Sequence, residues 1–342
     1  GRRAISLRAV AVAALIVLIL RPEALMGPGF QMSFAATTGL VAVFGWLREV
    51  RTEALPRPLR PVMAVVLSSA VAGLATAPIS AAHFNAVAHF GLVANLLSVP
   101  LMGLLVIPAA LTALLLAPFG LEELGLWVMG LGLRWILAVA GVIADMPNAR
   151  GFVASPNGWV LPLLAIGFLT LVLWQGRLRW SGIPMICLAF YLWHTGERPT
   201  VLIADTGTLV GVMTPQGRAL SKSKGAGFIA RNWLENDGDG AQQAAAAARW
   251  GGSPEFRSIV HLSGKRAVAQ FSGCDPGQVV VASVPLPPEM SANCAVYDPP
   301  KLRETGAVAM SPGPTGWQVV TAKERAGNRL WNRKTRRRSR GQ

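Results

Sequence analysis

Residues 82–119 contain no Asp, Glu, Lys or Arg, and this stretch constrains the fold more than any other part of the chain. So apolar a stretch belongs in lipid or in a large apolar core, and it is nearly twice as long as the roughly 20 residues that one bilayer crossing requires. It nevertheless contains polar and helix-breaking residues, namely Asn85, His89, Asn95, Pro100 and Pro108. Such residues at membrane depth indicate a broken helix, a packed bundle or a lined path rather than a simple anchor.

Composition divides the chain into a membrane half and a polar half. Of the 342 residues, 52% are hydrophobic and only 14% are charged, against about 25% charged residues in average soluble domains. Most of the charged residues come after residue 195. We therefore predict a polytopic α-helical membrane domain over residues 1–195, with about seven spans, followed by a small α+β soluble domain over residues 196–322. We expect residues 323–342, which are rich in Lys and Arg, to be a disordered tail that is solvated or binds anionic lipid or nucleic acid.

Seven apolar segments are the candidate spans: residues 4–20, 29–47, 61–80, 99–119, 124–145, 159–175 and 183–193. Residues 84–97 could lie in the interface or form a broken half-helix leading into the next span. If residues 84–97 do not cross the membrane, three clusters of arginines fall on one side: those before residue 9, those between residues 48 and 60, and those at 177 and 179. The positive-inside rule makes that side cytoplasmic. The soluble domain is then expected outside, with the protein in the cell inner membrane. The chain starts without Met, which favours a start within a longer membrane protein.

The polar half shows an α+β pattern. Residues 199–220 predict a β-hairpin around the turn at Thr206 and Gly207. Further strands are expected at residues 258–262, 267–271, 279–284 and 319–321, and helices at 228–235 and 242–249. The loop at 236–240, NDGDG, lacks the ligand pattern of an EF-hand and is interpreted as a solvated turn. In an oxidising compartment Cys274 and Cys294 would form a disulfide, and two buried free thiols are the alternative.

Three segments resemble the competence domain of the ComEC family: GPGFQMSFAATTGL at residues 27–40, HFNAVAHFGLVANLLSVPLMGLLVIPAALTALLL at 83–116, and IADMPNA at 143–149. The resemblance implies a channel that imports single-stranded DNA across the inner membrane during natural transformation. It implies single-stranded DNA and membrane lipid as partners, a DNA-receptor protein outside and a DNA-translocating ATPase inside. The chain has no GxxxxGK[ST] loop, so transport would be driven by such partners. The early regions of full-length family members are missing, which again favours a fragment.

The family often continues into a metallo-β-lactamase-like domain, and residues 201–220 resemble the opening hairpin of that domain or of a variant C-terminal region. The zinc hydrolases carry an HxHxDH motif, whereas this chain has four histidines and none lies in such a motif. A zinc centre needs several converging ligands. We therefore expect no metal, no cofactor and no enzymatic activity.

Four polar residues in the apolar segments are candidates for the DNA path: Gln31, Ser33, Asn95 and Arg134. A charge in mid-span is costly unless it is solvated or paired, and Arg134 could instead pair with Glu122 or Glu123. The amides could instead be structural hydrogen-bonding groups between helices. Pro100 and Pro108 are candidate helix breaks. Asn85 and His89 would share one helix face at a spacing of i, i+4, which is too few residues for a metal site. A small-solute secondary transporter with an extracytoplasmic sensor domain is the alternative function.

Overall fold

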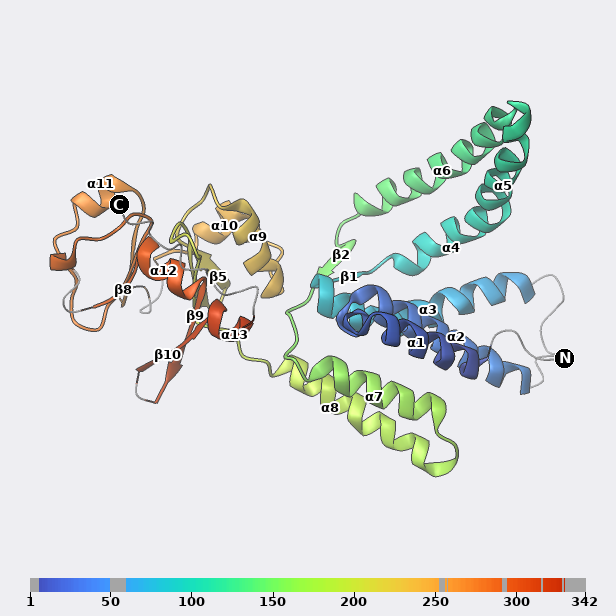
Figure 1. Ribbon diagram of the computed structural model, residues 1–342, viewed down its shortest axis with the longest axis horizontal. Coiled ribbons are helices and arrows are strands. Elements are labelled where there is room, and N and C mark those ends of the chain that lie inside the picture. Colours follow the sequence, from blue (N-terminus) through green and yellow to red (C-terminus); the bar gives the residue numbers. More distant parts are fainter. Residues whose placement is uncertain are drawn as a thin grey trace, which may run out of the picture. The chain divides into compact units, whose positions relative to one another are not determined.

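Antiparallel helical hairpins build the first of two compact units, Gly1–Thr195 and Gly196–Gln342, in the computed structural model (Figure 1). The structure describes residues 6–49, 60–251, 256, 258–290, 294–314, 316–327 and 329. The α-helices of the first unit are α1 (Leu7–Leu20), α2 (Pro28–Glu49), α3 (Arg60–Phe84), α4 (Gly91–Leu101), α5 (Ile107–Leu116), α6 (Glu122–Ala144), α7 (Val160–Leu173) and α8 (Gly182–His194). Short 3-10 turns at Pro22–Met26, Ala117–Phe119 and Gly176–Ser181 connect some of them.

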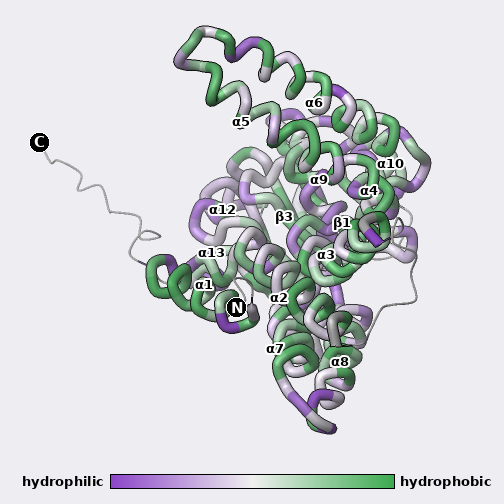
Figure 2. The backbone as a smooth tube through the Cα atoms, turned by 90° about the vertical axis from the view of Figure 1, so that its right-hand side faces the viewer, coloured by the Kyte–Doolittle hydropathy of each residue, from purple (hydrophilic) through white to green (hydrophobic). Residues whose placement is uncertain are grey.

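Four helical runs are long and apolar enough to cross a membrane: Pro28–Leu47, Val62–Phe84, Gly91–Phe119 and Glu122–Ala144. Helices α1 and α7 are apolar but shorter. Figure 2 shows mostly hydrophobic residues along α5, α7 and α8 and hydrophilic residues at the turn between α7 and α8. The predicted helical membrane domain is confirmed by these helices, since long apolar helices satisfy their own backbone hydrogen bonds in lipid.

Glycines let the helices of two hairpins, α5 with α6 and α7 with α8, approach closely. A Cβ atom on Gly132 of α6 would lie 2.6 Å from Cγ2 of Val106, and one on Gly125 would lie 2.5 Å from the backbone nitrogen of Ala113 in α5. A Cβ atom on Gly167 of α7 would lie 2.9 Å from the carbonyl oxygen of Gly182 in α8. The hydrophobic effect does not drive helices together within lipid, because lipid tails are as apolar as the side chains. Van der Waals contact at small residues is therefore a main source of affinity between such helices.

The long apolar stretch at residues 82–119 is one helix end, a short non-helical break and one long helical run. Helix α3 ends at Phe84, strand β1 (Ala86–Ala88) follows, and the next helix begins at Gly91. Residues 84–97 are therefore not a separate interfacial helix; their second half begins the next span, which was the other alternative left open by the sequence. Strand β1 pairs in antiparallel fashion with β2 (Arg150–Phe152).

Pro100 and Pro108 bend this long run without ending it. Pro100 lies inside α4, and Pro108 lies in the first turn of α5. Between them Met102–Val106 is π-helical, with the backbone N–H of Ile107 bonded to the carbonyl of Met102. Proline lacks an N–H donor, and a π-helical turn is one way to accommodate the lost hydrogen bond. Figure 1 shows the change of direction between α4 and α5.

Two β-sheets form the centre of the second unit. The antiparallel sheet has the order β10-β9-β3-β4-β5, and its strands are β3 (Val201–Ile203), β4 (Val210–Thr214), β5 (Gly217–Leu220), β9 (Val308–Gly313) and β10 (Gly316–Thr321). The parallel sheet has the order β6-β7-β8, with β6 (Ile259–Leu262), β7 (Val279–Ala282) and β8 (Ala295–Tyr297). One apolar core joins the two sheets, with Val201 and Val210 from the first and Ile259 and Val279 from the second.

Helices cover the outer faces of both sheets. Helices α9 (Gly227–Asn236) and α10 (Gln243–Ala247) contribute Ala230, Leu234 and Ala246 to a core with Leu220 of β5 and with Leu209, which directly precedes β4. Helix α11 (Lys265–Ala269) packs Val268 against the parallel sheet. Helices α12 (Pro299–Thr305) and α13 (Ala322–Ala326) and a 3-10 turn at Pro288–Met290 complete the unit. The predicted α+β class is confirmed, as is the hairpin formed by β3 and β4, with Gly207 at a positive φ of 64° in its turn.

Three local predictions for this unit are wrong. Residues 267–271 were expected as a strand, but residues 265–269 are α11, since Ala favours helix and Val268 is the one residue of the helix that is buried in the core. The NDGDG loop is not a solvated turn, because its two carboxylates form ion pairs with Arg218 and Arg249. The boundary at residue 323 falls inside α13, whose first turn is closed by a capping box of Thr321 and Glu324. Apart from Gly327 and Arg329, the rest of the tail lies outside the described residues.

Candidate functional site: a polar junction at one end of the helical unit

The end of α3 and strand β1 lie beside strand β2, which follows α6 (Figure 1), and polar side chains from these segments form hydrogen bonds there. We call this group the polar junction and define it as Gln31, His83, Asn85, His89 and Arg150. All three sequence segments that resemble the competence family end or begin here. Segments separated by more than 50 residues in sequence are held together at this point by side-chain hydrogen bonds.

Asn85 ties the end of α3 to the segment that precedes α7. Its backbone has a φ of 53°, a left-handed conformation that Asn tolerates better than most residues, and the residue is buried. Its Nδ2 donates to the Ser155 Oγ at 2.6 Å and to the Val153 carbonyl at 3.2 Å. The backbone N–H of Val153 donates in return to the Asn85 carbonyl at 3.0 Å.

His89 fixes the other end of the strand pair. Its backbone N–H donates to the Ala149 carbonyl at 3.1 Å, and its Nδ1 lies 2.6 Å from the Asn148 carbonyl oxygen. A carbonyl only accepts, so Nδ1 carries the hydrogen. The imidazole also lies on Gly151, where an added Cβ atom would be 2.5 Å from Nε2. Because β1 separates them, Asn85 and His89 do not share a helix face, and that prediction is wrong.

Gln31 is a bridge between α2 and α3. Its Nε2 donates to the Leu25 carbonyl at 2.8 Å, which turns its Oε1 towards Nε2 of His83, also at 2.8 Å. The imidazole Nε2–H is therefore the donor in this second bond. As a predicted path residue, Gln31 lies in the junction, and both ends of its amide are engaged in holding helix ends together.

Arg150 places an exposed cation at the junction. Its guanidinium lies 4.8 Å from the centre of the Phe152 ring, and its Nη2 donates to the Phe84 carbonyl at 3.5 Å. Trp193, near the end of α8, donates its indole N–H to the Ala154 carbonyl at 2.7 Å. Neither of these residues, nor His83, is predicted from the sequence as a site residue. The position of Arg150 directly after the family-like segment at residues 143–149 was a signal that could have pointed to it.

The helices alternately leave the junction and return to it. Helices α2, α4 and α7 begin near it, while α3, α6 and α8 end near it (Figure 1). Three of the arginines predicted to lie on one side therefore lie at the opposite end, where α3 begins with Arg60 and the turn before α8 contains Arg177 and Arg179, whereas Arg21 and Arg150 lie between helices at the junction end. Arg179 donates to the Leu171 carbonyl at 3.0 Å and lies over the Trp180 ring. The other predicted basic residues Arg2, Arg3, Arg51 and Arg57 lie outside the described residues.

None of the hydrogen bonds or ion pairs found among the described residues joins the other predicted path residues to one another. Ser33 is exposed on α2, Asn95 on α4 and Arg134 on α6. Arg134 has no ion pair within the described ranges, and Glu122 is about 18 Å away along the same helix, so the alternative pairing is not formed. Trp135 beside it donates to the Leu97 carbonyl at 3.3 Å, which joins α6 to α4.

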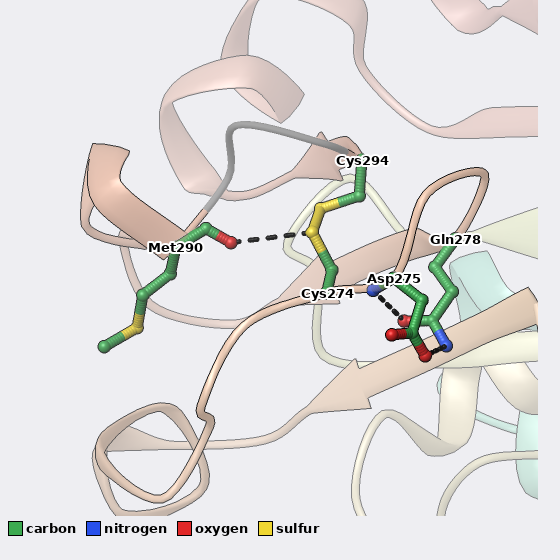
Figure 3. Close-up of a disulfide and its surroundings, with 5 residues drawn as sticks. All are labelled: Cys274, Asp275, Gln278, Met290 and Cys294. Carbon is green, nitrogen blue, oxygen red and sulfur yellow. Dashed lines mark hydrogen bonds between the residues drawn. A yellow bond between two sulfur atoms is a disulfide. The ribbon is translucent and has the colours of Figure 1, made fainter.

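The second unit contains a disulfide but no cluster of metal ligands among its described residues. Figure 3 shows the bond between Cys274 and Cys294, with the Met290 carbonyl oxygen 3.6 Å from the Cys274 sulfur. Asp275 and Gln278, also drawn there, close the adjacent turn with two hydrogen bonds. His261 donates Nε2–H to the Gly207 carbonyl at 3.1 Å, and burial lowers its pKa.

Comparisons with known proteins point to one family. A family model described as "Competence protein" matches residues 1–178, which is about half of the chain. An Escherichia coli (strain K12) protein described as uncharacterized protein YcaI is 26% identical over 239 residues, which cover 66% of this chain. The chain spans 30% of the length of that relative. No solved structure matches.

Proposed function

Because the chain belongs to the competence protein family, we propose that its helical unit forms part of a channel that carries single-stranded DNA across the inner membrane during natural transformation. The observation that carries this proposal is the convergence of the family-like segments on the polar junction. A role in DNA uptake fits the family, and the junction supplies the chemistry that a DNA strand requires at the end of a membrane path.

A single strand presents phosphates and bases, and the junction offers a partner for each. The exposed guanidinium of Arg150 suits a phosphate, and the Phe152 ring beside it suits a base. The β1–β2 pair and the hydrogen bonds of Asn85 and His89 hold these side chains on a fixed frame. Ser33, Asn95 and Arg134 are proposed to contact the strand further along the helices. A DNA receptor outside and a DNA-translocating ATPase inside are proposed to deliver and pull the strand.

Two observations support an orientation with the junction and the second unit outside the cytoplasm. The arginines at the opposite end of the helices favour a cytoplasmic location for that end. A disulfide between Cys274 and Cys294 is typical of an oxidising compartment. We propose that the second unit has no hydrolase activity, since its sequence lacks the HxHxDH motif.

Uptake of labelled DNA into a nuclease-resistant cytoplasmic form tests the proposal. Deletion of the gene in a transformable strain should abolish this uptake, and a gene that carries Arg150→Gln should restore it only weakly. Arg177→Gln, at the opposite end of the helices, is the matched control and should restore uptake fully. Immunoblots of membrane fractions establish that each variant accumulates equally. Normal uptake in the deletion strain would overturn the channel proposal, and normal uptake with Arg150→Gln would overturn the role of the junction.

A further inference from the structure

The segment that follows β5 and runs into the first turn of α9 presents an aromatic ring to solvent near two lysines in the sequence. We call residues 221–228, with the sequence SKSKGAGF, the basic loop. Phe228 is 84% exposed, the highest exposure of any large apolar side chain in the described residues. Lys224 is exposed as well, and Lys222 is partly exposed. A side chain exposed to this extent removes little of its apolar surface from water, so its burial contributes little to the stability of this unit.

The basic loop is held in one conformation. The side chain of Gln243 on α10 donates from Nε2 to the Gly225 carbonyl at 2.6 Å and to the Lys222 carbonyl at 3.1 Å. Gly225 and Ala226 have φ values of 82° and 53°, and the second is unfavourable for a residue with a side chain. A backbone that is ordered in this way loses little conformational entropy when it binds a ligand.

Charge around the loop favours an anionic ligand. No Asp or Glu occurs between residues 206 and 234, whereas four cationic side chains do. One of these, Arg218, is buried against Asp237, and another, Arg231, is paired with Glu235 on the surface. Lys222 and Lys224 therefore provide the positive charge beside Phe228, and the positive charge of Lys222 also contributes to the lowered pKa of His261.

We propose that the basic loop binds single-stranded DNA, with Lys222 and Lys224 on successive phosphates and Phe228 stacked on a base. This inference rests on the proposed function, because DNA is the cargo in both. The combination of lysines with one exposed aromatic ring suits single strands, since every base has a face that can stack. Binding to a lipid surface relies on several apolar side chains together. The other exposed large apolar side chains among the described residues of this unit are Val319 and Val320, on β10 at the far edge of the antiparallel sheet from β5.

Fluorescence anisotropy of a labelled thymidine oligonucleotide tests the inference with the full chain in zwitterionic nanodiscs. Phe228→Ala should weaken binding about 5- to 150-fold, the range for loss of one stacked base. Phe228→Tyr should bind like the wild type, whereas Phe228→Leu should resemble Phe228→Ala because leucine cannot stack. Lys222→Gln combined with Lys224→Gln should reduce the slope of log affinity against log salt by about 1.4.

Matched controls separate the loop from general surface effects. Lys301→Gln removes an exposed lysine on α12, and Val320→Ala trims an exposed apolar side chain on β10; both should bind DNA like the wild type. Unchanged affinity for Phe228→Ala, or wild-type affinity for Phe228→Leu, overturns the inference. So does a loop variant that loses binding to phosphatidylserine vesicles but keeps DNA affinity. The proposed channel fails on a different result, namely normal DNA uptake after deletion of the gene.

Discussion

Removal of Asp237 should destabilise the second unit more than any other single loss of an ion pair in the described residues. The Arg218 side chain is fully buried and the Asp237 side chain is 6% exposed. Arg218 donates two hydrogen bonds to Asp237, from Nε to Oδ2 at 2.5 Å and from Nη2 to Oδ1 at 3.2 Å. The guanidinium also donates to the carbonyls of Pro199 at 3.1 Å and Gly211 at 3.4 Å. Arg218 thus joins β5 to β4, to the end of α9 and to the start of the unit.

The expected magnitude follows from the burial of the cation. Asp237→Ala leaves a guanidinium in the core with carbonyl partners but no counter-ion, and loss of one partner of a buried pair costs about 3–5 kcal/mol. Whole domains are stable by about 5–15 kcal/mol, so this is a large share of the free energy of unfolding. At about 2–4 °C per kcal/mol for a domain of about 150 residues, the unfolding midpoint should fall by roughly 6–20 °C.

Hydrogen exchange of the full chain, followed by mass spectrometry of peptides from β4, β5 and α9, measures this loss. Glu235→Ala is the matched control on the same helix: its ion pair with Arg231 is at the surface, with 72% of the Arg231 side chain exposed, and should contribute less than about 1 kcal/mol. The double variant Arg218→Met with Asp237→Leu should recover much of the loss, because apolar residues replace both charges. Equal protection in Asp237→Ala and Glu235→Ala would refute the reasoning.

Two further predictions concern the second unit. Reduction of the disulfide, or Cys274→Ser with Cys294→Ser, opens a loop of sequence separation 20. The unfolded chain then gains conformational entropy, so the free energy of unfolding should fall by about 3 kcal/mol. A thermal melt that is unchanged by a reducing agent would contradict this. Burial lowers the pKa of His261 below its ordinary value of 6.5, so the unfolded chain binds the proton more readily than the folded one. The contribution of neutral His261 to the free energy of unfolding is therefore fully present above pH 6.5 and is lost as the pH falls from 6.5 through the folded-state pKa. Melts between pH 7.5 and pH 5 should therefore show a decline that His261→Gln reduces, and an equal decline in both proteins would exclude this histidine as the cause.

The helical unit was predictable because its signal lies in hydropathy and in local breakers. Apolar runs of about 20 residues allow few alternatives, and Asn85 within residues 82–119 marked the place where the helix ends. The hairpin of β3 and β4 was predictable from β-rich runs around Gly207. In contrast, β8 has three residues, and its conformation depends on parallel pairing with β7, a partner that no local pattern reveals.

The site was less predictable, because its contacts join residues that are far apart in sequence. His83 meets Gln31 over 52 residues and Asn85 meets Ser155 over 70 residues. Arg218 follows a turn and looks like a surface residue, and only the packing of α9 on the sheet brings Asp237 to it. The sequence did single out Asn85 and His89 as unusual, but it assigned them to a helix. Their actual roles depend on the strand pair, which forms through residues 150–152.

The strand pair also determines the depth at which the junction can lie. Strand β1 pairs with β2 on one side, and the two strands make up a two-stranded sheet, so both outer edges carry backbone groups without a strand partner. Such groups cost several kcal/mol each in the hydrocarbon core of a bilayer. The junction therefore belongs at the water-accessible end of the helices, where the exposed Arg150 is also solvated. At membrane depth the backbone of residues 91–119 stays helical throughout, with a π-helical turn at Met102–Val106. In the proposed channel the helices consequently contribute side chains, such as Asn95 and Arg134, to the path, whereas backbone contacts to DNA are restricted to the junction.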